Sequence, residues 1–205
     1  MGTIVSTLFI ALDGVAEIDP AWHFPYFDEN MGAAVGADYE DVDVLLLGRV
    51  TYDSFAGAWP DREEAGGDDA PFAKQIGDLR KLVATRGSAD LGWRNVEVTD
   101  DVVATVSALR ADESVGKVLV AGPASIVQQL LAAGVLDELR LLVHPVAAGK
   151  GTQLFARTEQ PQPLRLVSSE VFPTGVTQLV YAPADFRGAA SYEAAGETVP
   201  ANRWD

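Results

Sequence analysis

The chain has 205 residues, of which 48% are hydrophobic and 22% charged, a composition typical of a soluble globular protein with a full core. Its formal net charge of -15 argues against a nucleic-acid-binding protein, because phosphate contacts require clustered lysine and arginine. The absence of cysteine excludes disulfides, thiolate catalysis and cysteine-ligated metals.

The first residues predict a strand rather than a targeting segment. Thr3 to Leu12 is almost continuously apolar, no basic residue precedes it, and Asp13 follows directly. No apolar run elsewhere in the chain reaches the length of a membrane span. We therefore expect a cytoplasmic protein.

The rest of the chain predicts alternating helices and strands. Residues 17–25 and the Gly/Asp/Pro-rich residues 56–69 are expected to be loops, the second of them mobile. Apolar spacing and capping residues predict helices at 26–39, 49–55, 72–77, 101–110 and 125–133. Short apolar runs predict strands at 42–47, 80–85, 96–98, 118–121 and 139–143.

The chain ends with an expected hairpin and a tail. Residues 164–172 and 176–182 flank a Pro-Thr-Gly turn and predict two antiparallel strands. Residues 1–183 would then form one α/β domain with a mostly parallel central sheet between helices. Residues 184–205, rich in Ala, Gly and Glu, are expected to be a tail.

Three of the predicted strands end in turns that suit a phosphorylated ligand. Gly48-Arg49-Val50-Thr51 offers a glycine, a fixed positive charge and a hydroxyl, although the glycine could equally serve only to turn the chain. Thr85-Arg86-Gly87 is again polar and basic. Gly122-Pro123-Ala124-Ser125 opens a helix, whose free N–H groups favour an anion. All three turns are expected at the same edge of the sheet.

The order of four segments resembles the dihydrofolate reductase-like fold, and within it the bacterial family named for the RibD C-terminal domain, the reductase domain of riboflavin biosynthesis. These segments are FIALDGVA at 9–16, LLLGRVTYD at 45–53, VLVAGPASIVQQLLAAGVLDELRLLVHPV at 118–146 and GKGTQLF at 149–155. The likeness covers Thr3 to Tyr181 and implies a three-layer α/β fold. The zinc deaminase of the riboflavin enzyme is excluded, since its His-x-Glu and Pro-Cys-x-x-Cys motifs are missing.

The resemblance implies NADPH as cofactor. Arg49, with Arg86 beside it, would meet the 2′-phosphate and favour NADPH over NADH. The turn at Gly122 would hold the pyrophosphate, and the exit of the first strand would lie near the nicotinamide. The implied cofactor-binding residues are Ala11, Ala16, Gly48, Arg49, Val50, Thr51, Thr85, Arg86, Gly122, Pro123, Ala124, Ser125 and Ile126.

Dihydrofolate reductases carry a Gly-Gly pair with a cis peptide bond at the third turn. The present chain has Gly122-Pro123 there, and a cis bond before proline costs far less than one before any other residue. We therefore expect the Gly122–Pro123 bond to be cis.

On the substrate side two carboxylates are candidates for catalysis. Asp28 follows Trp22-His23-Phe24-Pro25. Partial burial among Trp22, Phe24, Tyr26 and Phe27 would raise its pKa and suit it to proton relay or to anchoring a substrate by a hydrogen bond. The alternative is a residue that only favours the helix dipole. Asp13 is the rival, near the expected nicotinamide, and could equally be a turn residue. The candidate substrate-binding residues are Trp22, Tyr26, Phe27 and Trp59, the last as part of a lid.

The only two histidines, His23 and His144, do not form a metal site by themselves, and His144 is expected to be a satisfied structural residue. The sequence thus predicts an NADPH-dependent reductase of a small pterin- or pyrimidine-like heteroaromatic or a carbonyl compound. Alternatives are an NADPH-binding sensor or sequestering module without turnover, and a structural homodimer whose ligand sites have decayed. The resemblance also implies a homodimer formed through the last strands of the sheet.

Overall fold

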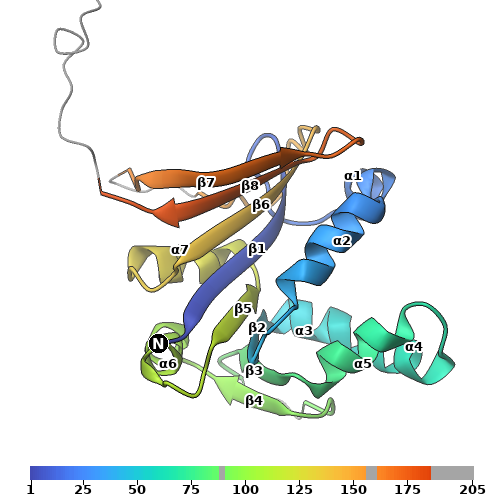
Figure 1. Ribbon diagram of the computed structural model, residues 1–205, viewed down its shortest axis with the longest axis vertical. Helices are drawn as coiled ribbons and strands as arrows, with labels where there is room; N and C mark the ends of the chain where they lie inside the picture. The colour runs from blue at the N-terminus through green and yellow to red at the C-terminus, as the bar shows by residue number, and fades with distance from the viewer. Residues whose placement is uncertain (88–90, 156–160, 186–205) are drawn as a thin grey trace, which may run out of the picture.

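The computed structural model describes residues 1–87, 91–155 and 161–185 (Figure 1). Its eight-stranded sheet has the order β4-β3-β2-β5-β1-β6-β8-β7. The strands are β1 (Thr3–Ala11), β2 (Val44–Gly48), β3 (Arg80–Ala84), β4 (Val96–Thr99), β5 (Lys117–Ala121), β6 (Glu138–His144), β7 (Leu164–Val171) and β8 (Thr177–Pro183). The helices are α1 (Pro20–His23), the 3-10 helix η1 (Phe24–Tyr26), α2 (Glu29–Asp38), α3 (Arg49–Ala56), α4 (Trp59–Ala65), α5 (Ala70–Asp78), α6 (Val102–Ala111) and α7 (Ala124–Ala132).

The sheet is parallel except at its last two strands. β1 pairs in parallel with β5 and with β6, so it lies at the centre, while β8 is antiparallel to both β6 and β7. The predicted α/β class, the mostly parallel sheet and the C-terminal hairpin are therefore confirmed. Nearly all of the predicted tail lies outside the described residues.

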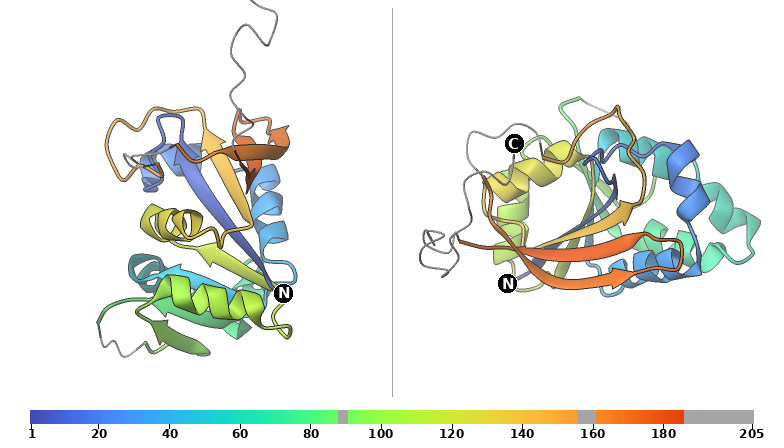
Figure 2. Two further views of the ribbon diagram at one scale, coloured as in Figure 1. Left: turned by 90° about the vertical axis from the view of Figure 1, so that its left-hand side faces the viewer. Right: turned by 90° about the horizontal axis from the view of Figure 1, so that it is seen from above.

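Helices cover both faces of the sheet. Ile4, Leu8 and Ile10 of β1 belong to a core cluster that also contains buried residues of α6 and α7. On the opposite face, buried residues of β2, β3 and β5 cluster with α3 and α5, and Met31 of α2 packs against Leu142 of β6. In the edge-on view α2 and α7 lie on opposite sides of the sheet (Figure 2). No helix among the described residues is long and apolar enough to cross a membrane.

Residues 56–69 contain a helix where the sequence predicted only a loop. α4 begins at Trp59, and Pro60 fits because the first helical turn needs no backbone donor there. The ring of Trp59 lies edge-on to Phe55 and Phe72, and the Arg62 guanidinium is 4.9 Å from its centroid. Trp59 is thus partly buried in a side-chain cluster, and the expectation that it stands in a loop is wrong, while its role as part of a lid stays a prediction.

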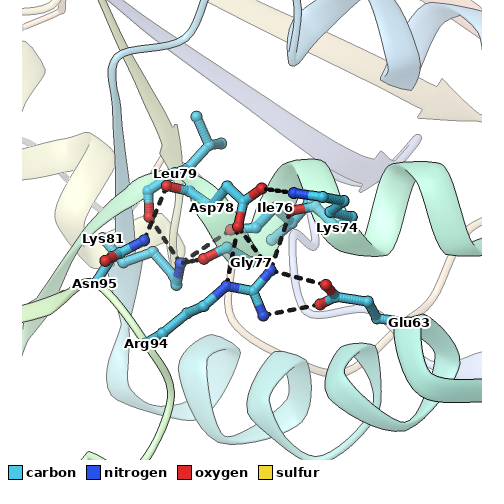
Figure 3. Close-up of polar contacts among 9 residues, drawn as sticks. All are labelled: Glu63, Lys74, Ile76, Gly77, Asp78, Leu79, Lys81, Arg94 and Asn95. Atoms are coloured by element: carbon cyan, nitrogen blue, oxygen red, sulfur yellow. Dashed lines mark hydrogen bonds and ion pairs between the residues drawn. The ribbon is translucent and has the colours of Figure 1, made fainter.

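The end of α5 is held by a buried lysine (Figure 3). Nζ of Lys81 donates hydrogen bonds to the carbonyls of Ile76, Gly77 and Leu79 at 2.9, 2.8 and 2.7 Å, and lies 4.4 Å from the centroid of the Trp93 ring. Carbonyls at a helix C-terminus otherwise lack donors, so the lysine supplies the hydrogen bonds that these carbonyls need. Desolvation lowers the pKa of Lys81 to about 8.

The segment before β4 is attached to three helices. Arg94 pairs with Glu63 of α4 and with Asp78 of α5 (Figure 3). The backbone N–H of Trp93 donates to the hydroxyl of Tyr52 in α3 at 3.2 Å. These contacts tie the β3–β4 connection to α3, the helix that follows the Gly48 turn.

Candidate functional site

The three predicted turns lie along one edge of the sheet. β3, β2 and β5 are neighbours and run parallel, so the turns that follow them leave the sheet on the same side. β5 ends beside the middle of β1, which continues beyond it to Ala11. In open α/β sheets ligands bind outside the carboxyl ends of the strands. The candidate site is this edge.

The turns after β2 and β5 are in close contact. A Cβ added to Gly48 would lie 2.3 Å from Cδ of Pro123, which no side chain could tolerate. A Cβ added to Gly122 would lie 3.2 Å from Cδ1 of Ile126. The two glycines therefore let the start of α3 approach the start of α7.

The peptide bond between Gly122 and Pro123 is trans, so the predicted cis bond is wrong. The prediction rested on the Gly-Gly pair of dihydrofolate reductases. Here the proline caps α7 with extended backbone, at φ -66° and ψ 156°, and its ring occupies the space next to Gly48.

Both helices at this contact begin without a side-chain cap. Asp28 and Asp101 accept hydrogen bonds from the first turns of α2 and α6, whereas Gly48 and Pro123 offer no such acceptor to α3 and α7 among the described residues. N–H groups in these two first turns are thus available to an anion, and the helix dipoles favour a negative charge.

Charged and hydroxyl side chains surround these helix starts. Arg49 is exposed and its Nε lies 2.9 Å from both carboxylate oxygens of Asp53 one turn further along α3. Thr51 is half-buried and Val50 is exposed. After β3, the hydroxyl of Thr85 accepts from the N–H of Gly87 at 3.2 Å.

The remaining cofactor candidates lie at or after the ends of β3, β5 and β1. Arg86 is exposed directly after Thr85, and Ser125 is exposed in the first turn of α7, beside the buried Ala124 and Ile126. Ala11 is buried at the end of β1, and the N–H of Ala16 donates to the carbonyl of Thr152 at 2.8 Å. The structure therefore brings the predicted residues of the three turns to one edge of the sheet, whereas Ala11 pairs with His144 and Ala16 with Thr152, further along the direction of β1.

Asp13 lies at the exit of β1 beside the 146–154 segment. Its Oδ2 accepts from the N–H of Gly149 at 2.7 Å, and this hydrogen bond holds the pKa of Asp13 below its ordinary value. A cavity of about 450 Å³ lies here, bordered by Asp13, Val15, Gln128 and residues 149–153. The side chain is an ionised acceptor that orders a loop, which favours the turn-residue interpretation.

Asp28 caps a helix, and its predicted raised pKa is wrong. Its carboxylate accepts from the N–H of Met31 at 2.9 Å and from the side chain of Asn30 at 3.1 Å. These hydrogen bonds lower the pKa of Asp28. The predicted helix start at residue 26 is too early for the same reason, because an N-cap lies outside the helix.

The other substrate candidates surround a pair of histidines that sequence reasoning did not bring together. Nδ1 of His23 lies 3.2 Å from Nε2 of His144, and both residues are buried. Trp22 and Tyr26 each lie edge-on to the His144 ring, and Phe27 lies edge-on to His23. Nδ1 of His144 is 3.0 Å from the carbonyl of Leu142, so the expectation of a satisfied structural histidine is confirmed.

With this geometry established, the comparison with known proteins decides the family. The model of the RibD C-terminal domain matches residues 2–178. The chain belongs to the RibD C-terminal domain family. That family is reductase-like, and the described residues contain no group of three or more side chains that could hold a metal ion.

Individual relatives agree with this assignment. The chain is 28% identical over 185 residues to the uncharacterized protein YyaP of Bacillus subtilis (strain 168), covering 87% of this chain and 93% of YyaP. A putative riboflavin biosynthesis protein from Shewanella sp. PV-4 has a similar structure, with a TM-score of 0.69 and 20% identity over 89% of this chain and 99% of that one. A pyrimidine reductase-like protein from Corynebacterium diphtheriae also has a similar structure, with a TM-score of 0.63 and 16% identity. The match covers 90% of this chain and 93% of that one. At these identities the two structures support the fold alone.

Proposed function

We propose that the protein is an NADPH-dependent reductase of a small heteroaromatic or carbonyl compound. The observation that carries the proposal is the contact between Gly48 and Pro123, which places two uncapped helix starts side by side. Two adjacent sets of free N–H groups suit a dinucleotide, whose phosphates are separated along one molecule. Family membership supports a reductase of this kind.

The residues at the edge fit NADPH by their chemistry. N–H groups at the start of α7 would hold the pyrophosphate, and Arg49 and Arg86 would pair with the 2′-phosphate. Ala11 and Ala16 would lie against the nicotinamide, where small side chains leave room for a flat ring. Arg49 could leave Asp53 and pair with a phosphate at little cost in free energy, because the Arg49–Asp53 ion pair is exposed and therefore weak.

The chemical step needs few groups from the protein. Bound NADPH would supply a hydride to the electrophilic carbon of a C=N or C=O bond, and a proton from water would complete the new N–H or O–H bond. The chain would orient the substrate and exclude water from the transfer. Both candidate carboxylates are held ionised by backbone N–H groups, so we give neither Asp13 nor Asp28 the role of proton donor.

The alternative is a nucleotide-binding module without turnover, and one experiment separates the two. Purified protein with NADPH is mixed with a panel of pterins, pyrimidinones and quinones, and NADPH absorbance is followed. Steady NADPH loss with one class of compound, absent in a Gly48→Ala variant, is the expected result. NADPH binding without oxidation across the panel would favour the sensor or sequestering module.

We also propose a homodimer that forms through the exposed strand β7. β7 is the last strand of the sheet, and Leu166, Val167 and Val171 are 49%, 49% and 71% exposed there. β7 carries these exposed apolar residues among polar ones, and an unpaired edge strand is a template for pairing with a second chain. Val171→Asp should convert a dimer to a monomer in size-exclusion chromatography with light scattering. Val98→Asp, at a half-exposed residue of the opposite edge strand β4, is the control and should leave the dimer intact.

A further inference from the structure

The histidine pair lies next to the expected position of the nicotinamide. His144 is the last residue of β6, and its sheet partner is Ala11, the last residue of β1. His23 ends α1, a segment 121 residues earlier in the chain. The pair thus connects the aromatic segment 20–27 to the end of the central strand.

The hydrogen bonds of the pair favour one placement of the ring protons. Two backbone carbonyls, of Leu142 and Ile10, accept from the His144 ring, and the carbonyl of Leu142 lies 3.0 Å from Nδ1. We infer that Nδ1 carries the proton in the neutral ring and that Nε2 keeps a lone pair. Because Nε2 of His144 is then an acceptor, Nδ1 of His23 must be the donor across the 3.2 Å contact. Nε2 of His23 is consequently left unprotonated.

We propose that Nε2 of His23 is a hydrogen-bond acceptor for an N–H or O–H group of a planar substrate, and that His144 fixes it in this form. This inference rests on the proposed reductase function and names the substrate class: flat rings with a donor group on one edge. No hydrogen bond to this nitrogen is found among the described residues, whereas the other three ring nitrogens of the pair are engaged.

The surroundings of His23 favour a flat apolar ligand. The rings of Phe24 and Phe27 lie 5.2 and 5.6 Å from the His23 ring, and these side chains are 64% and 46% exposed. His23 is 5% exposed as a residue, but its Nε2 is not among the buried unpaired side-chain atoms, so a ligand can reach it. Exposed aromatic rings around one accessible acceptor are typical of ligand sites, where apolar walls hold the ligand and a few polar groups orient it.

His23 does not readily take up a second proton, so it is a poor proton donor near neutral pH. The rings that face His23 come from Phe9 of β1, from Trp22, Phe24 and Phe27 of its own segment and from His144 of β6, so His144 is the one titratable group in these ring contacts. Desolvation, and then repulsion from His144, lower the pKa of His23 to about 4. A neutral acceptor therefore persists at pH 7, and the proton of the reduction comes from water.

Long-range ¹H–¹⁵N NMR of the imidazole rings tests the protonation pattern directly, and with only two histidines one variant assigns both. At pH 7 both rings should carry the proton on Nδ1. A proton on Nε2 of His23 would overturn the proposal. This measurement needs no nucleotide, so its outcome is independent of whether the protein binds NADPH.

Ligand binding tests the acceptor itself, with 2-aminopyrimidine and 2-(dimethylamino)pyrimidine as probes. The amino compound should bind to the protein saturated with NADP⁺ about tenfold more tightly, since the dimethylamino compound would cover Nε2 of His23 without donating a hydrogen bond to it. It should also shift the Nε2 signal of His23, and His23→Phe should abolish the preference without changing the affinity for NADPH. Equal affinities, or no binding of the amino compound, would contradict the proposal, whereas failure of the protein to bind NADPH would count against the proposed function.

Discussion

Pro123 occupies the space that a side chain at residue 48 would need. The two residues follow neighbouring strands, β2 and β5, and their contact brings the starts of α3 and α7 together. A Cβ atom at residue 48 would lie 2.3 Å from Cδ of Pro123, and no rotamer change could relieve this overlap, since the proline ring is rigid. The contact between the starts of α3 and α7 therefore depends on glycine at position 48.

Gly48→Ala should weaken both folding and nucleotide binding. Overpacking against Pro123 should lower the free energy of unfolding by about 1–3 kcal/mol, and separation of the two helix starts should weaken NADPH binding at least tenfold. Gly36→Ala in α2 is the matched control, because nothing lies within 4 Å of its Cβ position. It should stabilise the protein by up to about 1 kcal/mol. Urea unfolding and NADPH titration of both variants check this, and wild-type behaviour of Gly48→Ala would disprove it.

Lys81→Met should destabilise the protein by about 2–3 kcal/mol, because three carbonyls at the end of α5 lose a buried donor. Lys74→Met removes an exposed partner of Asp78 from the same helix and should cost less than about 1 kcal/mol. Thermal or urea unfolding of the two variants measures the difference. Equal, small effects would mean that the carbonyls do not depend on Lys81.

The histidine pair should make stability dependent on pH. The pKa of His23 is lowered from 6.5 to about 4 in the folded protein, so the unfolded state binds the extra proton as the pH falls. The stability that neutral His23 contributes to the folded protein is therefore fully present above pH 6.5 and is lost as the pH falls toward about 4. The free energy of unfolding should fall by about 2–3 kcal/mol over this range because of His23. Desolvation lowers the pKa of His144 as well, with the same sign.

The measurement is the free energy of unfolding from pH 7 to pH 4 for the wild type and for His23→Phe. Because carboxylates titrate in the same range in both proteins, the difference between the two curves isolates the histidine. The free energy of unfolding of the wild type relative to His23→Phe should fall by at least about 1 kcal/mol between pH 6.5 and pH 4.5. Parallel curves would show that His23 titrates normally in the folded state.

Much of the fold could be predicted from local pattern. Apolar runs such as Leu45–Leu47 and Val118–Val120 are buried on both faces of a parallel sheet, so their length and branching identified them as strands. The turns after these strands were expected at one edge of the sheet, and the structure has them there. α4 was missed because its Gly-, Asp- and Pro-rich surroundings resemble a loop, although Pro60 is acceptable in a first helical turn.

The candidate substrate side was less predictable, because it depends on contacts between distant residues. No periodicity in the sequence could show that His23 lies 3.2 Å from His144. The role of Asp28 was accessible, since an aspartate three residues before Met31 is a common N-cap pattern, and the expectation of a desolvated carboxylate obscured it. The bond at Gly122 was inferred from a relative with a different residue pair, which this structure does not follow.

The most direct test of the account is calorimetric titration of the protein with NADPH and with NADH, in the wild type, Arg49→Ala and Arg80→Ala. Arg80 is the matched control, since it is an exposed arginine that pairs with Glu97. It is the first residue of β3 and so lies at the end of the sheet opposite to the candidate site. NADPH should bind at least tenfold more tightly than NADH, Arg49→Ala should remove this preference, and Arg80→Ala should retain it. Failure of the wild type to bind either nucleotide would contradict the central claim.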